Sequence, residues 1–337
     1  MAHEHLIENE FLNHCQRIDE SPENNRTKYI EIFPKTILNK VISTDIGFAF
    51  SMNPYQGCEH GCTYCYARNT HEYWGYSAGL DFERKILYKK NAAELLDFKL
   101  KSRTWEAQNI MLSGNTDCYQ PIEKKLAITR EILQVFLKHK HPVSIITKNA
   151  LILRDLDILK EMARLKLVHV SISVTSLIEE TRLILEPRTT SIKKRLETIK
   201  ILSDNSIPVN VMMAPIIPAI NSHEIFNLVK KVSEIGASSA AYTVVRLNGS
   251  IANIFKDWLN KMLPDSAEKI IHQIEDCHGG QLNDSRFGKR MRGEGKIAEQ
   301  IAIQFRLAKK KHLNNICMPP LDYSLYNDLK NRQYKLF

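Results

Sequence analysis

Three cysteines lie within eight residues of one another in the segment Cys58-Glu-His-Gly-Cys62-Thr-Tyr-Cys65. Thiolates are soft ligands that suit iron–sulfur clusters or zinc. Gly57 and Gly61 permit the tight backbone that wraps such a centre. Three thiols leave one corner of a four-metal cluster without a protein ligand. A structural zinc site needs four ligands, so the alternative zinc site would recruit His60 or Cys118 as its fourth.

From about residue 46 the sequence predicts strands that alternate regularly with helices, and these elements must position the thiols. Runs of apolar and β-branched residues predict strands at 47–52, 109–112, 143–147, 167–174, 209–213 and 240–245. Helical spacing occurs at 91–100, 122–137, 156–165, 192–202 and 223–235, and then at 254–262, 265–277 and 296–312. Nearly continuous apolar strands alternating with helices indicate a parallel sheet covered by helices. Because a closed barrel needs eight repeats, six repeats predict an α/β fold of the partial (β/α)6 TIM-barrel type.

The cysteine segment directly follows the first predicted strand. Barrel enzymes carry their chemistry at that carboxyl-terminal edge of the strands, so the thiols are expected at the barrel mouth. We divide the chain into an N-terminal extension (1–45), a barrel core (46–250) and a helical, basic C-terminal segment (251–337).

Composition and cysteine usage bound the class of protein. An apolar share of 43% and a charged share of 25% are typical of a soluble globular protein. No stretch approaches the ~20 uninterrupted apolar residues of a membrane span, and the polar N-terminus does not resemble a secretory signal. Seven cysteines, an odd number in a chain without an export signal, predict reduced thiols. We therefore expect a cytoplasmic protein with no membrane partner.

The net charge of +9 is unevenly distributed along the chain. Residues 1–45 carry five basic and eight acidic side chains, whereas 286–311 carry nine basic and two acidic ones. Such a basic segment suits a polyanionic partner, and nucleic acid is the partner we expect. The structural alternative is the solvated face of a helix.

The CxxxCxxC spacing, with Tyr64 just before the last cysteine, resembles the signature of the radical S-adenosylmethionine (SAM) superfamily. The resemblance implies that Cys58, Cys62 and Cys65 hold three irons of a [4Fe–4S] cluster, and that SAM chelates the fourth. Reductive cleavage of SAM would then give a 5′-deoxyadenosyl radical that abstracts hydrogen from a substrate. The superfamily's partial six-strand barrel agrees with the strand count above. The resemblance also implies an electron donor such as flavodoxin or ferredoxin.

Further segments within about residues 46–220 resemble the spore photoproduct lyase branch, also called DNA repair photolyase-like. They are Asn53-Pro54-Tyr55-Gln56-Gly57, Tyr64-Cys65-Tyr66-Ala67-Arg68, Ser113-Gly114-Asn115-Thr116-Asp117, Thr129-Arg130, Ile146-Thr147-Lys148, Leu185-Glu186-Pro187-Arg188-Thr189 and Met213-Ala214-Pro215-Ile216. By this resemblance SAM is held by Ser113, Thr116, Lys148 and Ser171. A lysine supplies a point charge for the methionyl carboxylate, and hydroxyls accept from its ammonium group. The structural alternatives are helix capping by the hydroxyls and a surface position for the lysine.

Arg188 is a further candidate, because a guanidinium binds a carboxylate bidentately. Glu186 is the acidic neighbour that would otherwise occupy it. Tyr64 is expected near the adenine. The resemblance gives Tyr66 a role in hydrogen-atom relay, and aromatic packing is the alternative for both tyrosines.

One departure from the lyases affects the reaction. They carry a hydrogen-donor cysteine in the turn after the second strand, where this sequence has Gly114. Cys118 is the candidate substitute, and its alternative is a small buried apolar residue. Three hypotheses follow: a radical enzyme acting on nucleic acid, a radical enzyme acting on a peptide or small metabolite, and a non-enzymatic iron–sulfur or zinc protein that binds nucleic acid.

Overall fold

The chain forms an open, seven-stranded sheet in a computed structural model that describes residues 26–43, 45–314 and 316–334. The strand order is β10-β9-β8-β7-β6-β3-β2. The bounds are β2 Leu38–Lys40, β3 Phe50–Met52, β6 Ile110–Leu112, β7 Val143–Thr147, β8 Val168–Ser173, β9 Val209–Ile216 and β10 Ser239–Val244. All neighbours from β3 to β10 pair in parallel, and only β2 runs antiparallel to its neighbour. The six predicted strands are therefore present in the predicted parallel arrangement.

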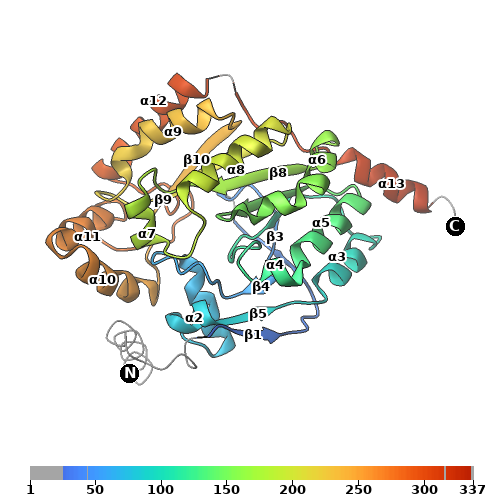
Figure 1. The fold of residues 1–337 in the computed structure, drawn as a ribbon, viewed down its shortest axis with the longest axis horizontal. Helices are drawn as coiled ribbons and strands as arrows, with labels where there is room; N and C mark the ends of the chain where they lie inside the picture. The colour runs from blue at the N-terminus through green and yellow to red at the C-terminus, as the bar shows by residue number, and fades with distance from the viewer. Residues whose placement is uncertain (1–25, 44, 315, 335–337) are drawn as a thin grey trace.

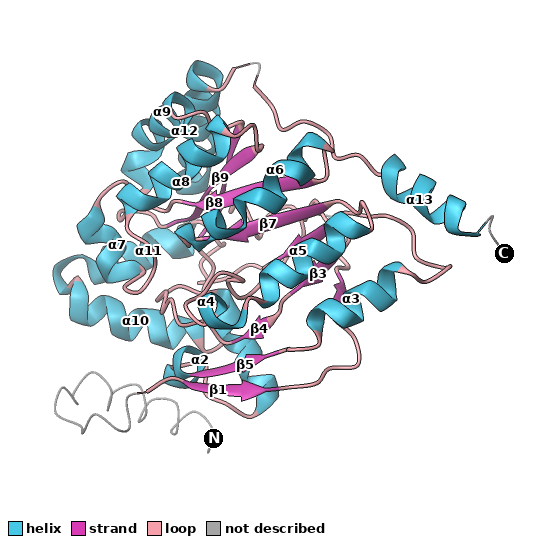
Figure 2. Ribbon diagram, turned by 45° about the vertical axis from the view of Figure 1, so that its right-hand side comes forward, coloured by secondary structure: helices cyan, strands magenta, loops and turns pink. Residues whose placement is uncertain are grey.

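Helices cover the outer face of this sheet (Figures 1 and 2). They include α3 (Ala92–Leu100), α5 (Ile128–Lys138), α6 (Leu156–Arg164), α8 (Ile192–Asp204) and α9 (Ile225–Glu234). The apolar stripe of each helix faces the strands, as in α5, where Ile132, Leu133 and Phe136 are fully buried. The shorter helices α4 (Glu123–Leu126) and α7 (Glu179–Leu185) lie in connections between strands and helices.

A second, three-stranded sheet lies beside the barrel, at the bottom of Figure 1, and was not predicted. Its order is β1 (Lys28–Glu31), β5 (Lys85–Tyr88) and β4 (Tyr55–Gln56). The 3-10 helix η1 (Tyr66–Trp74) and the helix α2 (Leu80–Arg84) connect β4 to β5. Regular structure thus begins before the predicted boundary at residue 45, because β1 and β2 both precede it.

The C-terminal segment packs against the barrel through several helices. They are α10 (Ile251–Met262), α11 (Ala267–Asp276), α12 (Lys296–His312) and α13 (Ser324–Tyr334), with the 3-10 turn η4 (Pro264–Ser266) before α11. In Figures 1 and 2 α12 lies along α9, and α13 extends from the opposite side. Phe305 of α12 stacks on Tyr242 of β10 with ring centroids 4.6 Å apart. No helix in the described ranges is long and apolar enough to cross a bilayer.

The open side of the barrel is spanned by residues 282–291, which run beside the outer edge of β10. The Val244 N–H donates to the Met291 carbonyl at 3.0 Å, and the Leu247 N–H donates to the Leu282 carbonyl at 2.9 Å. Arg290 then pairs with Asp45, in the loop between β2 and β3, at 2.6 Å between Nη2 and Oδ1. This ion pair joins the two ends of the seven-stranded sheet, and we call the contact the seam.

Candidate active site

The cysteine loop, residues 57–65, leaves β4 through a backbone that only glycine adopts easily. Gly57 has φ of +80°, and a Cβ there would lie 2.8 Å from the Lys85 carbonyl oxygen. The next residue, Cys58, donates its N–H to the Phe82 carbonyl at 2.8 Å. Gly61 has φ of +68°, and a Cβ there would meet the Arg188 guanidinium. Both glycines allow the close turns that were predicted to wrap a metal centre.

Glu59 anchors this loop to the barrel. Its N–H donates to the Gln120 side chain at 3.1 Å, and its carboxylate accepts from the Ile122 N–H at 3.2 Å. The Tyr29 hydroxyl of β1 donates to the same carboxylate at 2.9 Å. The small sheet and the chain after β6 therefore hold the loop from two sides.

The three thiols are free and share one electrostatic environment. Cys58 and Cys62 are nearly buried, and Cys65 is half-buried. Burial raises the pKa of the Cys58 thiol, and the charges of Asp117 and Cys62 add to the effect. Burial likewise raises the pKa of Cys62 to about 12. A cationic iron centre would reverse both effects, because metal-bound cysteine is deprotonated.

The loop fits a cluster better than a single zinc ion. Among the described residues, no three His, Cys, Asp or Glu side chains are gathered closely enough to hold one metal ion. His60, a candidate fourth zinc ligand, instead has Nδ1 3.5 Å from Asp117 and Nε2 3.5 Å from Asn149. Burial lowers the pKa of His60 to about 4, so the ring is neutral at pH 7. The thiols can hold separate irons of one cluster.

Asp117, which follows β6, connects the loop to the next strand. Its carboxylate accepts from the Lys148 N–H at 2.7 Å and from the Thr147 hydroxyl at 2.7 Å. It also accepts from the Tyr119 N–H at 2.9 Å. The carboxylate thereby fixes the backbone at the end of β7, which carries the Lys148 side chain.

Lys148 lies at this edge, beside the cysteine loop. Its Nζ is 5.9 Å from the Tyr64 ring centroid, and in the described part of the chain it has no hydrogen-bond or ion-pair partner. Burial lowers the pKa of Lys148, but the charges of Cys62 and Glu186 outweigh burial and raise it. The ammonium is thus charged and available to an anionic group.

A buried ionic centre formed by Glu186 and Arg195 lies beside Lys148. The Glu186 carboxylate accepts from the Tyr64 hydroxyl, from Thr175 at 2.9 Å and from Arg195 Nη2 at 2.6 Å. Burial alone would raise the pKa of Glu186, but Arg195 and Lys148 lower it to about 2. Glu186 is therefore ionised at neutral pH. The sequence reasoning assigned no site role to Glu186 or Arg195.

Arg188 lies on the outside of the loop and is half exposed. Its guanidinium contacts Glu83, and its Nε donates to the Glu59 carbonyl. The acidic partner of the Arg188 guanidinium is therefore Glu83 and not Glu186. The role of Arg188 toward SAM stays a prediction, and one that would require breaking these contacts.

The hydroxyls of Ser113 and Thr116 hold the turn after β6 together. Ser113, with φ of +77°, donates to the Thr116 carbonyl at 2.6 Å and accepts from the Cys118 N–H at 2.9 Å. Thr116 donates to the Tyr55 carbonyl at 2.6 Å. On β8, the Ser171 hydroxyl accepts from Asn210 at 3.1 Å. All three lie in or at the end of a barrel strand, but each already has a partner within the chain.

Tyr66 and Cys118 have opposite environments. Tyr66 is 44% exposed, and its hydroxyl donates to the Gly114 carbonyl. Its pKa is raised to about 12 by local burial and by Cys65, against the opposing charges of Arg246 and Lys148. Cys118 is fully buried in the main hydrophobic core, as its structural alternative predicted. Tyr66 thus contacts the turn after β6, while Cys118 is enclosed in the core. The relay role of Tyr66 and the donor role of Cys118 stay predictions.

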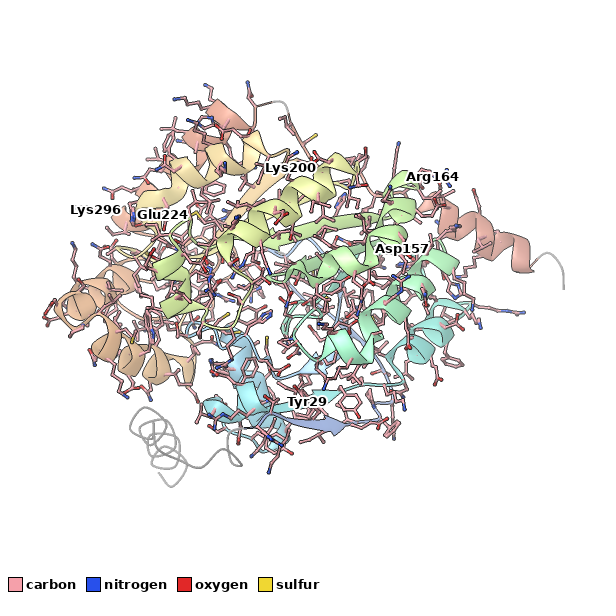
Figure 3. The ribbon with its side chains drawn as sticks, viewed as in Figure 1. Tyr29, Asp157, Arg164, Lys200, Glu224 and Lys296 are labelled. Atoms are coloured by element: carbon pink, nitrogen blue, oxygen red, sulfur yellow. The ribbon has the colours of Figure 1, made fainter. Side chains whose placement is uncertain are left out.

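Several cations of the basic segment 286–311 are paired with acidic side chains. Arg286 and Lys289 pair with Glu294, and Arg290 pairs with Asp45. Figure 3 labels Lys296, the first residue of α12, and Glu224, which precedes α9. Their sequence neighbours Ile297 and His223 line one pocket, so these two helix starts lie close together. The other end of α12 lies beside the end of α9, because Ser233 donates to the His312 carbonyl.

The direction of α12 places its lysines away from the cysteine loop. Helix α9 ends just before β10 begins, so the end of α12 lies at the amino-terminal edge of the strands. Lys309, Lys310 and Lys311 belong to that last turn, whereas the cysteine loop is at the carboxyl-terminal edge. Nucleic-acid binding by this segment stays a prediction.

A half-open parallel barrel with a cysteine loop at its carboxyl-terminal edge defines a class of metal-dependent barrel enzymes. Residues 52–232, more than half of the chain, match the Radical SAM superfamily. The chain belongs to this superfamily. The predicted family, the partial barrel and the assignment as a radical SAM enzyme are thereby confirmed.

The chain is also similar in sequence to curated relatives and in fold to solved structures. An uncharacterized protein of Mycobacterium tuberculosis is 30% identical over 248 residues, covering 73% of each chain. One of Methanocaldococcus jannaschii is 29% identical over 249 residues, covering 73% of this chain and 88% of the relative. A mutant spore photoproduct lyase aligns with TM-score 0.64 at 14% identity, over 85% of this chain and 80% of that one. Another, with bound AdoMet and dinucleoside spore photoproduct, has TM-score 0.62 at 14% identity, over 84% and 79%.

Proposed function

We propose that this enzyme holds a [4Fe–4S] cluster through Cys58, Cys62 and Cys65 and acts on nucleic acid. When bound, the reduced cluster and SAM supply a 5′-deoxyadenosyl radical for hydrogen abstraction. The observation that carries the proposal is that three free thiols share one loop with Tyr64, and that Lys148 Nζ lies 5.9 Å from the Tyr64 ring and has no hydrogen-bond or ion-pair partner within the described residues.

The residues around the thiols have distinct tasks in this proposal. Lys148 binds the methionyl carboxylate of SAM, because its ammonium lies beside the cysteine loop and has no partner among the described residues. Glu186 holds Tyr64 in place through its hydroxyl and balances the charge of Lys148. Tyr66, exposed at the mouth and bonded to the Gly114 carbonyl, is placed to pass a hydrogen atom between SAM and substrate.

Support for nucleic acid as the substrate class comes from the fold that the chain shares with spore photoproduct lyase. Gly114 replaces the donor cysteine of the lyases, and Cys118 is enclosed. The hydrogen donor must therefore differ, and we do not propose reversal of a thymine lesion. A flavodoxin or ferredoxin supplies the electron.

Anaerobic reconstitution tests the radical chemistry. The protein is loaded with iron and sulfide, then incubated with dithionite and SAM, and 5′-deoxyadenosine is measured by chromatography. Replacing Cys58, Cys62 or Cys65 by Ala should abolish its release, because the cluster loses an iron ligand. Cys317→Ala is the matched control, since Cys317 is exposed and outside the loop, and it should retain activity. A wild-type protein that binds zinc tightly and releases no 5′-deoxyadenosine would refute the proposal.

A binding measurement tests the substrate class. Duplex DNA, single-stranded DNA and RNA are titrated at low salt and then at rising salt, because phosphate contacts make affinity fall steeply with salt. Failure of all three to bind, in a protein that still cleaves SAM, would favour a peptide or small metabolite.

A further inference from the structure

Arg246 differs from the other arginines packed into this protein. Arg68 donates to the Cys62 and Gly79 carbonyls at 3.1 and 2.9 Å, and Arg195 donates to Glu186 at 2.6 Å. The Arg246 side chain is half-buried, yet within the described residues it has no hydrogen-bond or ion-pair partner. Its guanidinium nitrogens still reach solvent, so the unpaired charge is open to an external anion.

The surroundings of Arg246 favour an external anion over an internal partner. Burial lowers its pKa and the neighbouring Arg290 lowers it further, while Tyr66 and Asp45 oppose them. Asp45 is the nearby acid, but its carboxylate is already bonded to Arg290 Nε at 2.8 Å and to Ser43 at 2.5 Å. Two guanidinium groups, Arg290 in contact and Arg246 nearby, thus face one carboxylate, which leaves the local charge positive.

The position of Arg246 relates this charge to the chemistry. It follows β10 by two residues, at the same strand edge as the cysteine loop. The chain after Arg246 contacts the 3-10 helix η1, which begins with the exposed Tyr66, because Asn69 of η1 donates to the Asn248 carbonyl at 2.6 Å. A group bound by Arg246 would therefore hold a substrate beside Tyr66, separate from Lys148 on β7.

We propose that Arg246 binds a phosphate group of the nucleic-acid substrate and thereby places the neighbouring nucleotide beside Tyr66. The planar guanidinium fork matches two phosphate oxygens, so the contact is bidentate and charge-assisted. This assignment rests on the proposed nucleic-acid substrate. It locates the phosphate contact at the barrel mouth instead of at the lysines of α12.

The test compares Arg246→Gln with Arg306→Gln, which removes the same charge from the exposed face of α12. A fluorescent single-stranded oligonucleotide is titrated into each reconstituted protein at several salt concentrations. Arg246→Gln should weaken binding about ten- to hundredfold, the effect of one charge-assisted contact. It should also reduce the slope of log affinity against log salt by about 0.7, the value for one phosphate on a single strand. Arg306→Gln should change affinity less than about threefold.

Further measurements separate the outcomes. Arg246→Lys keeps the charge without the fork, and it should restore the salt slope but only part of the affinity. Thermal unfolding of Arg246→Gln should match the wild type, because no internal bond is lost. Equal affinity of Arg246→Gln and wild type, or an equal loss in Arg306→Gln, overturns the assignment alone. A wild type that releases 5′-deoxyadenosine but binds no oligonucleotide overturns both the assignment and the substrate class. A wild type without SAM cleavage refutes the proposed function itself.

Discussion

Replacing Glu186 by Gln should destabilise the protein by roughly 3 kcal/mol at pH 7. The surroundings lower the pKa of this carboxyl from 4.5 to about 2. Because one pKa unit corresponds to about 1.36 kcal/mol, the folded state stabilises the ionised form by roughly 3 kcal/mol. Arg195 is 1% exposed in this pair and Glu186 is fully buried, so solvent does not screen the interaction. Removing one partner of a buried ion pair typically destabilises a protein by about 3–5 kcal/mol, and the value obtained from the pKa agrees with this range.

Urea unfolding of the cluster-free protein, followed by circular dichroism, measures this difference. Glu161→Gln is the control, because Glu161 pairs with Arg164 on the exposed surface and such pairs contribute about 1 kcal/mol or less. The pH dependence has a defined sign. Folding lowers the pKa of Glu186, so its ionised carboxylate stabilises the fold at pH values above the pKa in the unfolded chain, near 4.5. This stabilisation is lost as the pH falls toward 2. The difference in free energy of unfolding between the wild type and Glu186→Gln should therefore become smaller below pH 4.5. A Glu186→Gln protein as stable as wild type at pH 7 would refute the reasoning.

Three further substitutions have expected outcomes. Lys148→Ala should weaken SAM binding about ten- to hundredfold, whereas Lys148→Arg should retain most of the affinity for SAM. Calorimetric titration of the reconstituted protein with SAM measures both. Gly57→Ala should lower the amount of iron bound per chain, because the added Cβ would lie 2.8 Å from a carbonyl oxygen and the backbone φ of +80° disfavours alanine. Gly47→Ala is the control: its Cβ meets open space, and the variant should bind iron normally. Arg290→Gln should speed proteolytic cleavage in 41–49, since the seam contact to this loop is lost; an unchanged digestion rate would contradict the bridging role of the seam.

Much of the barrel could be predicted from sequence because its strands are runs of apolar and β-branched residues, at least every second one buried. Their β-branched runs, such as Val143–Thr147, have few alternative structures. The strand β9 extends to Ile216, three residues beyond the predicted end, because Pro215 did not terminate it. The small sheet gave no comparable signal. Its members are two to four residues long, and β1 is mostly exposed, so neither periodicity nor hydrophobicity marked them.

The site was predictable where one short segment carries the chemistry. The three cysteines follow a fixed spacing, and Lys148 immediately follows a strand. The partners of Glu186 and Arg188 depended instead on contacts between distant segments. Tyr64 donates to Glu186, and Glu83 contacts the Arg188 guanidinium, each across more than a hundred positions in the sequence. No local pattern encodes such pairings, which arise only when the loops after several strands meet.

The residues beside β10 have a consequence for how the chain can be shortened. A partial barrel ends in a strand whose backbone groups can recruit a strand from another molecule. Here the Leu282 and Met291 carbonyls accept the β10-side N–H groups of Leu247 and Val244. A fragment ending at residue 280 would lack these caps and expose the strand. Such a fragment should self-associate even though all three cysteines of the loop and all six parallel strands remain, because residues 282–291 no longer cover the edge of β10.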